Sequence, residues 1–396
     1  MIGKLMKLVY LADTQIPSRA TNGMQIMRMC AAFAAHGADV TLVHPHRFGN
    51  RPEGYFGDVW AFYGVPEKFR LVTLPTPLTL KLSSFEQFAR VARGVPLSAW
   101  ILGRSRPGAQ PFVAYSRSML GAWLAMRARR FWGSRSACRG IYIELHDAPR
   151  TSDAWKTIAD ADGVVAISEA LRHHVSSRQP NLAGRMFVEH DGVDGRLLTG
   201  VPLGREMARR KLAIDGHATV VGYTGRVTTH KGVDTLLLAA KLLQAEPFRF
   251  LLVGKVYGDI DPHEAQRLAN ITLTGFVPPP EVPSYVAASD ILVMPTSATL
   301  SYSQFTSPLK LFEYMASNRP VICSDLPVLR EVMTHERNAL LFRPDDAASL
   351  TDAITRLRGE PELARSLAEQ ASRDVIHHTW ENRAKRILSE IAMRVR

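Results

Sequence analysis

The sequence predicts an α/β protein made of two doubly wound, Rossmann-like domains that face each other across a cleft. Its 396 residues are enough for two domains of ordinary size, each with its own buried core. A content of 46% hydrophobic and 22% charged residues is typical of a globular protein, neither disordered nor membrane-spanning. In both halves short apolar runs alternate with helical stretches, which is the pattern of a parallel sheet with helices on both faces.

The first half begins with a predicted strand at 7–12 and a helix at 24–35, whose apolar residues recur every three or four positions. Gly37 stands where a glycine commonly ends a helix, and a buried strand follows at 39–44. Further strands are predicted at 140–145, 163–167 and 186–189. Residues 45–110 are rich in proline and glycine, and their pattern predicts no order of elements.

The second half repeats this alternation more regularly. Its apolar runs predict strands at 218–223, 249–253, 271–274, 291–294 and 320–323. Four glycines and one proline between Asp191 and Gly204 indicate a domain boundary. We therefore expect an N-terminal domain over 1–195 and a C-terminal domain over 196–379, with a last helix, 380–396, that packs back on the first domain. Ligands of such sheets lie beyond the carboxyl ends of the strands.

The N-terminus and the cysteines both indicate a cytoplasmic protein. The apolar run Leu8–Ala12 is too short for a signal peptide or a spanning helix. Cys30, Cys138 and Cys323 are far apart and have no C-x-x-C spacing. We expect them to be reduced, buried residues, which argues against a disulfide framework or a zinc site.

The clearest chemical signal is the segment YTGRVTTHKGVDTLL at 223–237. A buried strand is expected to end at Gly225 and a helix to open after Gly232, with Arg226 and Lys231 on the loop between them. A helix N-terminus and two cations attract anionic oxygens, so the loop predicts a diphosphate site that could also stabilise a departing diphosphate. Two ordinary surface cations are the alternative. No G-x-x-x-x-G-K-[ST] occurs and no G-x-G-x-x-G follows the first strand, which disfavours P-loop enzymes and dehydrogenases.

A second segment, SPLKLFEYMASNRPVICSD at 307–325, enters a helix with Pro308 in its first turn. Glu313 and Lys310 are three residues apart and hence neighbours on the helix surface. A carboxylate near a diphosphate site is suited to accept hydrogen bonds from two ribose hydroxyls. A surface ion pair between Glu313 and Lys310 is the alternative.

Together these segments resemble the donor-binding half of family 4 of the retaining nucleotide-sugar glycosyltransferases, which have the GT-B fold. Leu252-Val-Gly, Leu273-Thr-Gly-Phe-Val and Ala288-Ser-Asp-Ile-Leu-Val-Met-Pro lie between them in the family's order. The first half agrees at Asn22-Gly-Met-Gln, Ala34-Ala-His-Gly-Ala-Asp-Val-Thr-Leu, Glu144-Leu-His-Asp, Ala161-Asp-Gly-Val-Val-Ala-Ile-Ser and Asp191-Gly-Val-Asp. The resemblance covers nearly the whole chain apart from 45–110 and implies a retaining glycosyltransferase of hexosyltransferase type.

The resemblance also implies roles for individual residues. Arg226 and Lys231 would hold the donor diphosphate, and Glu313 would bind the ribose. His146 would face the transferred sugar, with Glu144 on the same side of the strand if the strand runs that far; a lone histidine is more often structural.

Further residues complete the donor site implied by the resemblance. Phe276 and Val277 would lie beside the base, and the loop at Gly23 would approach the phosphates, where a glycine leaves room for them. The donor-binding residues as a whole are Asn22, Gly23, Gly225, Phe276, Val277, Ser307, Leu309 and Lys310.

One position departs from the family. The first glutamate of the family's E-x7-E pair, counted back from Glu313, is Phe305, and no acid occurs from Ile291 to Phe312. In the family that glutamate commonly contacts a hydroxyl of the donor sugar, so the identity of the sugar stays open.

The resemblance implies a front-face mechanism, in which the acceptor hydroxyl attacks from the side that the diphosphate leaves and needs no pair of catalytic carboxylates. Positioning and leaving-group stabilisation would supply most of the catalysis. Asp259-Ile-Asp261 is interpreted as exposed turn chemistry, not as a metal site. Since Arg226 and Lys231 would do what a bound cation does elsewhere, we expect no cofactor and no metal, with the nucleotide sugar as co-substrate.

The acceptor is expected on the first domain, where positive charge gathers. Residues 81–139 contain one acid, Glu86, and eleven basic residues: Lys81, Arg90, Arg93, Arg104, Arg106, Arg117, Arg127, Arg129, Arg130, Arg135 and Arg139. Such a patch favours anions, although a solvated basic face is the alternative. Residues 119–132 mix aromatic residues and arginines as an interfacial helix does, or form a core helix with an arginine-rich end.

We therefore expect peripheral binding to the inner face of the cell membrane and a glycan or lipid-linked glycan acceptor, in bacterial cell-surface polysaccharide or glycolipid synthesis. Two other functions stay open. One is a non-catalytic nucleotide-sugar-binding scaffold, suggested by Phe305; the other is a nucleotide-sugar 2-epimerase, whose carboxylate-rich site is not evident here. Nucleic-acid binding is disfavoured because the basic stretch has no recognised motif.

Overall fold

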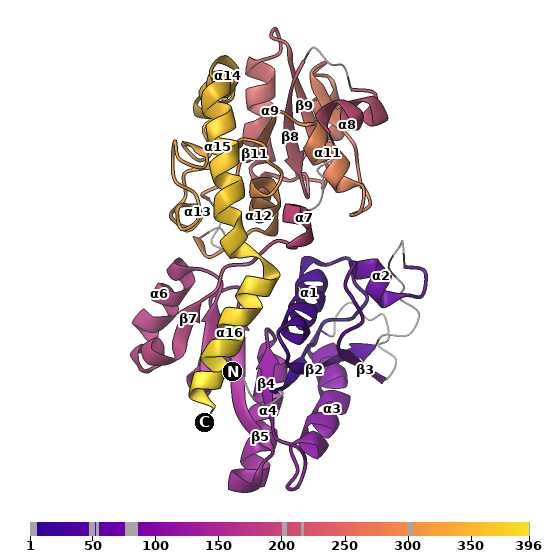
Figure 1. Cartoon of the computed structure of the whole chain (residues 1–396), viewed down its shortest axis with the longest axis vertical. Coiled ribbons are helices and arrows are strands. Elements are labelled where there is room, and N and C mark those ends of the chain that lie inside the picture. The colour runs from indigo at the N-terminus through magenta and orange to yellow at the C-terminus, as the bar shows by residue number, and fades with distance from the viewer. Residues whose placement is uncertain are drawn as a thin grey trace. The chain divides into compact units, whose positions relative to one another are not determined.

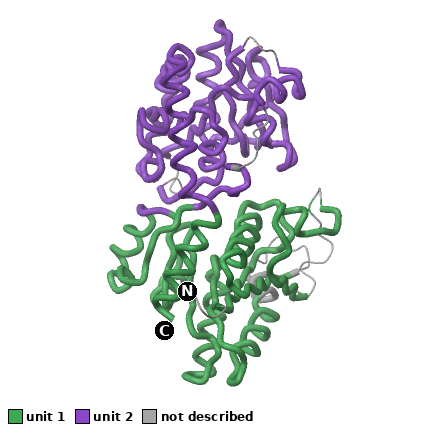
Figure 2. Tube along the Cα trace, viewed as in Figure 1, with its two compact units in different colours: residues 1–167, 171–190, 380–396 green, residues 168–170, 191–379 purple. Residues whose placement is uncertain are grey.

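The computed structural model describes residues 6–46, 52, 55–75, 86–199, 204–214, 218–299 and 304–395, with the side chains of 46, 86–93 and 199 left aside. The chain divides into two compact units (Figure 2). Unit 1 comprises residues 1–167, 171–190 and 380–396, and unit 2 comprises residues 168–170 and 191–379. Each unit is described by itself.

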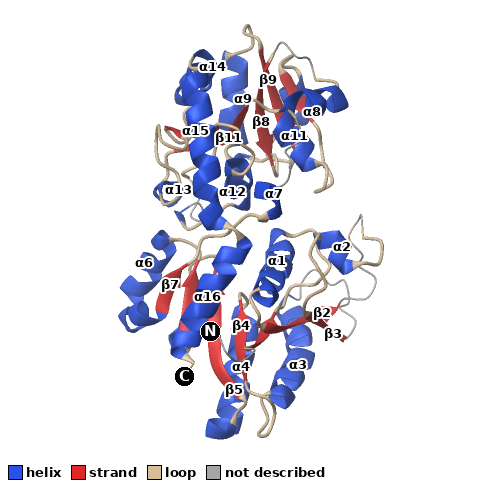
Figure 3. Cartoon of the chain, in the orientation of Figure 1, coloured by secondary structure: helices blue, strands red, loops and turns tan. Residues whose placement is uncertain are grey.

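Unit 1 is built on a parallel sheet of seven described strands in the order β3-β2-β1-β4-β5-β6-β7 (Figures 1 and 3). The strands are β1 Lys7–Leu11, β2 Asp39–His46, β3 Arg70–Pro75, β4 Phe112–Ser116, β5 Cys138–Leu145, β6 Gly163–Ala166 and β7 Met186–Val188. The helices are α1 Thr21–Ala35, α2 Val59–Tyr63, α3 Glu86–Arg104, α4 Met119–Trp132, α5 Ser152–Ala159, α6 Glu169–Arg178 and α16 Trp380–Arg394. The strand order reverses between β1 and β4, which is where sheets of this kind bind ligands.

Unit 2 has a parallel sheet of six described strands in the order β10-β9-β8-β11-β12-β13. The strands are β8 Thr219–Thr224, β9 Phe248–Val253, β10 Ile271–Leu273, β11 Ile291–Met294, β12 Val321–Ser324 and β13 Leu340–Phe342. The helices are α7 Arg196–Thr199, α8 Arg205–Leu212, α9 Val233–Leu242, α10 Pro262–Gln266, α11 Val282–Ala288, α12 Leu309–Met315, α13 Pro327–Arg330, α14 Ala347–Gly359 and α15 Pro361–Asp374. Here the order reverses between β8 and β11, so the carboxyl end of β8 is the expected binding edge.

Both sheets confirm the predicted α/β fold with doubly wound parallel sheets. The central strands are buried on both faces, as their continuous apolar runs require. The structure adds β4, β13 and, within 45–110, the elements α2, β3 and α3, which the sequence patterns did not predict.

Helix α16 belongs to unit 1 and packs against α1. Its buried residues recur at three- and four-residue spacing: Trp380, Arg383, Ala384, Ile387, Leu388 and Ile391. This stripe is apolar except for Arg383, whose side chain has no exposed surface. A buried guanidinium needs a partner, which for Arg383 is the carboxylate of Glu144.

Helix α4 has two different sides. Its inner side buries Gly121, Ala122, Leu124, Ala125, Met126 and Ala128 and packs on α3, β4 and β5. This side is that of a core helix, the alternative to an interfacial one. The outer side exposes 45% of Trp123 and 68% of Phe131.

Several arginines of the predicted basic patch have partners within unit 1. Arg129 and Arg130 pair with Asp162 and Asp160, and Arg117 donates a hydrogen bond to Gln25. Lys81 lies outside the described residues, as do the side chains of Arg90 and Arg93. Part of the positive charge of the patch is therefore balanced by acidic residues of the same unit.

The three cysteines are buried and free, as predicted. Burial raises the pKa of the Cys30, Cys138 and Cys323 thiols, which keeps them protonated. Among the described residues, no helix has both the length and the apolar character needed to cross a membrane.

Candidate functional site

The loop after β8 is shaped by two glycines. Gly225 follows the strand with a φ of +124°, and its N–H donates to the Val253 carbonyl at 2.8 Å. Gly232 precedes α9 with a φ of +70°, and a Cβ there would lie 1.5 Å from the Pro295 carbonyl oxygen. Both the left-handed backbone and the close approach of the residue after β11 therefore require glycine at position 232.

Three cations gather beside this loop. The Lys310 ammonium lies over the Tyr223 ring, 3.9 Å from the ring centroid, and 3.2 Å from where a Cβ of Gly225 would stand. Lys231 and Arg226 come from the loop itself, and the Arg226 guanidinium is 5.9 Å from the centroid of the Tyr257 ring. Sequence spacing suggested a surface ion pair between Lys310 and Glu313. In the structure the Lys310 ammonium lies beside the loop instead.

Lys231 lies close enough to Arg226 and to Lys310 for their positive charges to repel one another. Burial lowers the pKa of Lys231, and the Arg226 charge lowers it further. Burial likewise holds the pKa of Lys310 well below its usual range, with Lys231 acting in the same direction and Glu313 opposing it. Confined, mutually repelling cations are stabilised when an anion enters among them.

The carboxylate of Asp259 ties down the same loop. It accepts hydrogen bonds from the Thr228 hydroxyl and from the Thr229 N–H (2.8 Å) and hydroxyl (2.6 Å). These bonds lower the pKa of Asp259 to about 2. Asp261 caps α10 by accepting from the His263 N–H at 2.8 Å. The interpretation of Asp259-Ile-Asp261 as exposed turn chemistry is thus confirmed, and the anchoring of the loop by Asp259 is an addition to it.

Helix α12 is fastened to the end of β8. The Tyr314 hydroxyl accepts from the Thr224 N–H at 2.7 Å, which places α12, with the half-buried Lys310 and Glu313, next to the loop. Ser307, just before the helix, accepts from the Asp191 N–H at 2.9 Å. Leu309 is the first residue of α12 and is half-buried.

The remaining residues predicted for the donor site lie apart from this cluster along the chain. Val277 is buried with Val220, Leu251 and Val253, so its side chain belongs to the core. Phe276, the preceding residue, is 45% exposed, so its ring is accessible to a ligand. Phe305, in place of the family's glutamate, is half-buried, and its carbonyl accepts from the Ser168 hydroxyl at 3.1 Å.

In unit 1, Asn22 and Gly23 differ from the prediction because α1 begins at Thr21, three residues earlier than expected. Gly23 is therefore a buried residue of the first helical turn and not part of a loop. A Cβ there would lie 2.8 Å from the Tyr63 hydroxyl oxygen, which explains the glycine without a phosphate. Asn22 donates to the Thr14 hydroxyl at 3.0 Å.

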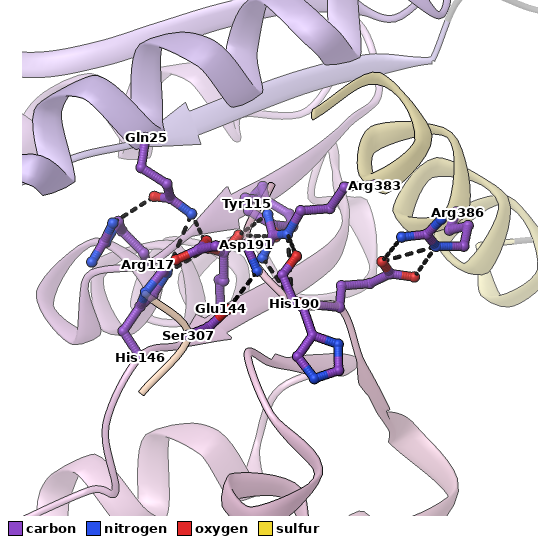
Figure 4. A network of polar contacts seen from close by, with 11 residues as sticks. Gln25, Tyr115, Arg117, Glu144, His146, His190, Asp191, Ser307, Arg383 and Arg386 are labelled. Atoms are coloured by element: carbon purple, nitrogen blue, oxygen red, sulfur yellow. Dashed lines mark hydrogen bonds and ion pairs between the residues drawn. The ribbon is translucent and has the colours of Figure 1, made fainter. Parts of the chain in front are cut away.

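His146 lies one residue beyond β5, and the prediction that it shares a side with Glu144 is confirmed. Its Nε2 is 2.5 Å from Glu144 Oε1 (Figure 4). Residues that the sequence did not single out surround the pair: Gln25 from α1, Tyr115 from β4, and Arg383 from α16. These residues are far from Glu144 in the sequence, and Arg383 is 239 residues away, so only the structure shows that they are neighbours.

Comparison with known proteins gives a family match for part of the chain and a fold match for nearly all of it. The family model "Glycosyl transferases group 1" matches residues 218–359, which include the loop after β8 and α12. A Bacillus subtilis (strain 168) glycosyltransferase named for teichuronic acid biosynthesis, TuaH, is 29% identical over 174 residues, 43% of this chain and 42% of TuaH. The chain thus spans less than half the length of that relative.

A longer match is the D-inositol 3-phosphate glycosyltransferase of Corynebacterium urealyticum, 27% identical over 302 residues and 70% of each chain. Among solved structures, Anabaena HepE in complex with UDP has a TM-score of 0.72 at 18% identity, over 98% of this chain and 100% of HepE. This likeness shows the fold, two Rossmann-like domains of GT-B type.

Proposed function

We propose that the protein, in which residues 218–359 form a Glycosyl transferases group 1 domain of GT-B type, is a sugar-transferring enzyme. The sugar passes from a nucleotide diphosphate donor to an acceptor hydroxyl with retention of configuration. One observation carries the proposal: Arg226, Lys231 and Lys310 converge at the carboxyl end of β8, and the carboxylate of Glu313 is near them. HepE, which has the same fold, was crystallised with UDP.

In this proposal each charged group has one task. Arg226, Lys231 and Lys310 neutralise the diphosphate, and the half-buried position of the two lysines strengthens their attraction for it. Glu313 accepts hydrogen bonds from the ribose hydroxyls, and the exposed ring of Phe276 stacks beside the base.

The transfer itself follows a front-face path. The acceptor oxygen bonds to the anomeric carbon on the face from which the phosphate oxygen departs, so one C–O bond forms as the other breaks. The acceptor proton passes to the departing phosphate, whose negative charge the three cations stabilise. Because the leaving group serves as the base, no second carboxylate is required.

Metal independence is part of the proposal. The cations supply the charge that a divalent ion would otherwise bring to the diphosphate, and Asp259 and Asp261 are engaged in the loop and in a helix cap. Transfer in the presence of EDTA tests this; activity that EDTA removes and magnesium restores would refute it.

The experiment for the function is a screen of UDP-, GDP- and ADP-sugars for nucleotide release with EDTA present. Arg226→Ala/Lys231→Ala is the test variant, and Lys241→Ala, an exposed lysine on α9, is the matched control. Release from one donor that is lost in the double variant and kept in the control supports the proposal. Release that is equal in all three proteins refutes the assigned site.

Two other outcomes separate the competing functions. Nucleotide binding without release, even with membrane extract as acceptor source, supports the non-catalytic scaffold and directs attention to Phe305. Conversion of a donor sugar into its C2 epimer without acceptor supports a 2-epimerase.

We further propose a glycan or lipid-linked glycan acceptor and contact with an anionic membrane surface through the outer side of α4. Trp123 and Phe131 are exposed there, and the Arg127 guanidinium lies 5.5 Å from the centroid of the Trp123 ring. Aromatic side chains with adjacent arginines suit a lipid interface, where each cation contributes about 1 kcal/mol. In this proposal the protein works at the inner face of a bacterial cell membrane, in polysaccharide or glycolipid synthesis.

Flotation with anionic vesicles at low salt tests the membrane contact. Trp123→Ala/Phe131→Ala is expected to lose binding. Leu238→Ala/Leu242→Ala, which removes two exposed apolar side chains from α9 of unit 2, is expected to keep it. Failure of the unmodified protein to float would remove this part of the proposal.

A further inference from the structure

The carboxylate of Glu144 is the centre of a buried network in unit 1 (Figure 4). Its side chain has no exposed surface, yet both oxygens have two donors each. Oε1 accepts from Gln25 Nε2 and faces His146 Nε2. Oε2 accepts from the Tyr115 hydroxyl and from Arg383 Nη1 at 3.2 Å. The four acceptor positions of the carboxylate are therefore filled.

The charges around Glu144 keep it ionised. Burial alone would raise the pKa of this carboxyl, but Arg383, the hydrogen bond with His146 and the more distant Arg117 together hold the pKa well below its usual range. An ionised carboxylate with filled acceptor positions neither attacks carbon nor takes up a proton. Glu144 therefore acts through the groups that it binds.

The orientation of Gln25 determines which groups face the histidine. Arg117 Nη1 donates to Gln25 Oε1, so the Gln25 amide must present its NH2 group to Glu144. That nitrogen is also 3.3 Å from His146 Nε2. The shorter contact decides the assignment: the Glu144 oxygen 2.5 Å away can only accept, so this ring nitrogen must carry a proton that it donates to Oε1.

Arg383 supplies the fixed end of the network. Besides Glu144, its guanidinium donates to the His190 carbonyl at 2.9 Å and to the Glu189 carbonyl at 3.2 Å, and its side chain is fully buried. The Glu144 carboxylate is thus clamped from α16 on one oxygen and directs the His146 ring with the other. The His146 side chain keeps 19% of its surface exposed.

We propose that Glu144 and Arg383 are positioning residues that fix His146 as the Nε2-protonated tautomer, so that Nδ1 is presented as a hydrogen-bond acceptor for a hydroxyl of the bound substrate. The inference rests on the proposed function for the identity of the ligand. The tautomer itself can be determined with no donor or acceptor bound.

The test is the state of the His146 ring in the full chain, read by ¹⁵N NMR of histidine-labelled protein, with His146→Asn to assign the signals. The expected spectrum has a proton on Nε2 and a bare Nδ1. A proton on Nδ1, whether Nε2 is bare or also protonated, would overturn the inference even if sugar transfer is found. A correct tautomer in a protein without transferase activity would instead count against the proposed function only.

Glu144→Gln gives the sharper second result. Tyr115 and Arg383 both donate, so the oxygen of the new amide must face them and its NH2 group must face His146. Nε2 then has to accept, and the tautomer is expected to invert, with kcat/KM falling about tenfold or more and nucleotide affinity unchanged. Glu189→Gln is the matched control, because the Glu189 carboxylate binds Arg386, which lies on α16 like Arg383.

If Glu144→Gln fails to fold, Arg383→Lys and the unmodified protein still decide the question. The substituted lysine keeps the charge but has no planar fork, so a loosened carboxylate is expected to leave a mixture of tautomers. Retention of a single Nε2-protonated form and of full kcat in this variant would show that Arg383 takes no part in positioning.

Discussion

Replacing Arg383 with methionine is predicted to destabilise unit 1 by about 3–5 kcal/mol, the range found when one partner of a buried ion pair is removed. Methionine fills much of the same volume, so the loss comes from charge and hydrogen bonding. Both side chains of the Arg383–Glu144 pair have no exposed surface, and the guanidinium also serves two backbone carbonyls. The variant would leave the Glu144 carboxylate without its main counter-charge.

The pH dependence of this effect has a definite sign. The folded-state pKa of Glu144 is depressed, so its contribution to stability is present above the unfolded glutamate pKa and is lost as pH falls through the folded value. The destabilisation by Arg383→Met should therefore be largest near neutral pH and should shrink as the pH falls towards the folded-state pKa of Glu144, which lies well below its usual range.

Urea unfolding followed by circular dichroism, with amide hydrogen exchange to localise the change to α16 and β5, measures the effect. Lys385→Met, an exposed position on the same helix, is the control and should stay within about 0.5 kcal/mol. Adding Glu144→Gln to Arg383→Met should recover part of the loss, since a neutral amide costs less to bury than a carboxylate. A loss below about 1 kcal/mol, the same at pH 4 and pH 7, would show that the Arg383–Glu144 ion pair does not stabilise unit 1.

Three further predictions concern the loop after β8. Gly232→Ala should abolish donor binding and lower stability by several kcal/mol by urea unfolding, because a left-handed φ costs about 1–2 kcal/mol and the new Cβ would overlap a backbone carbonyl; wild-type affinity would contradict the assigned geometry. Asp259→Ala should release the loop without unfolding the protein, so nucleotide binding measured by calorimetry should weaken severalfold. The control Asp261→Ala should leave nucleotide binding unchanged. Tyr314→Phe should lower stability by about 1–3 kcal/mol, because the Thr224 N–H loses its acceptor, and a neutral result would mean that another acceptor replaces the hydroxyl.

The fold could be predicted where the periodicity of the sequence is strong. The runs at 219–224, 248–253 and 291–294 are buried on both faces, so their apolar residues are continuous and the strands were predicted to within one residue. β3 was missed because its apolar residues, Leu71, Val72 and Leu74, lie within the proline- and glycine-rich stretch 45–110, in which no order of elements was predicted. α1 was predicted to begin three residues late because its N-cap residue, Ala20, has no capping side chain.

The candidate site was predictable only where its residues are neighbours in sequence. Arg226 and Lys231 stand on one motif, and local spacing was enough to mark them, whereas spacing alone gave Lys310 only as a surface partner of Glu313. Glu144 could be paired with His146 by the two-residue period of a strand. Arg383 gave no such signal, because an arginine among apolar residues of a helix is read as an exposed cation until the partner from β5 is seen.

Arg226, Lys231 and Lys310 are proposed to hold the donor diphosphate. Calorimetric titration of Lys231→Ala and of the Lys241→Ala control with a nucleoside diphosphate, and with the same nucleoside without phosphates, tests it most directly. We predict that Lys231→Ala weakens binding of the diphosphate about tenfold or more and leaves the nucleoside unaffected, while the control changes neither. Equal diphosphate affinity in Lys231→Ala and the unmodified protein would show that Lys231 does not hold the diphosphate.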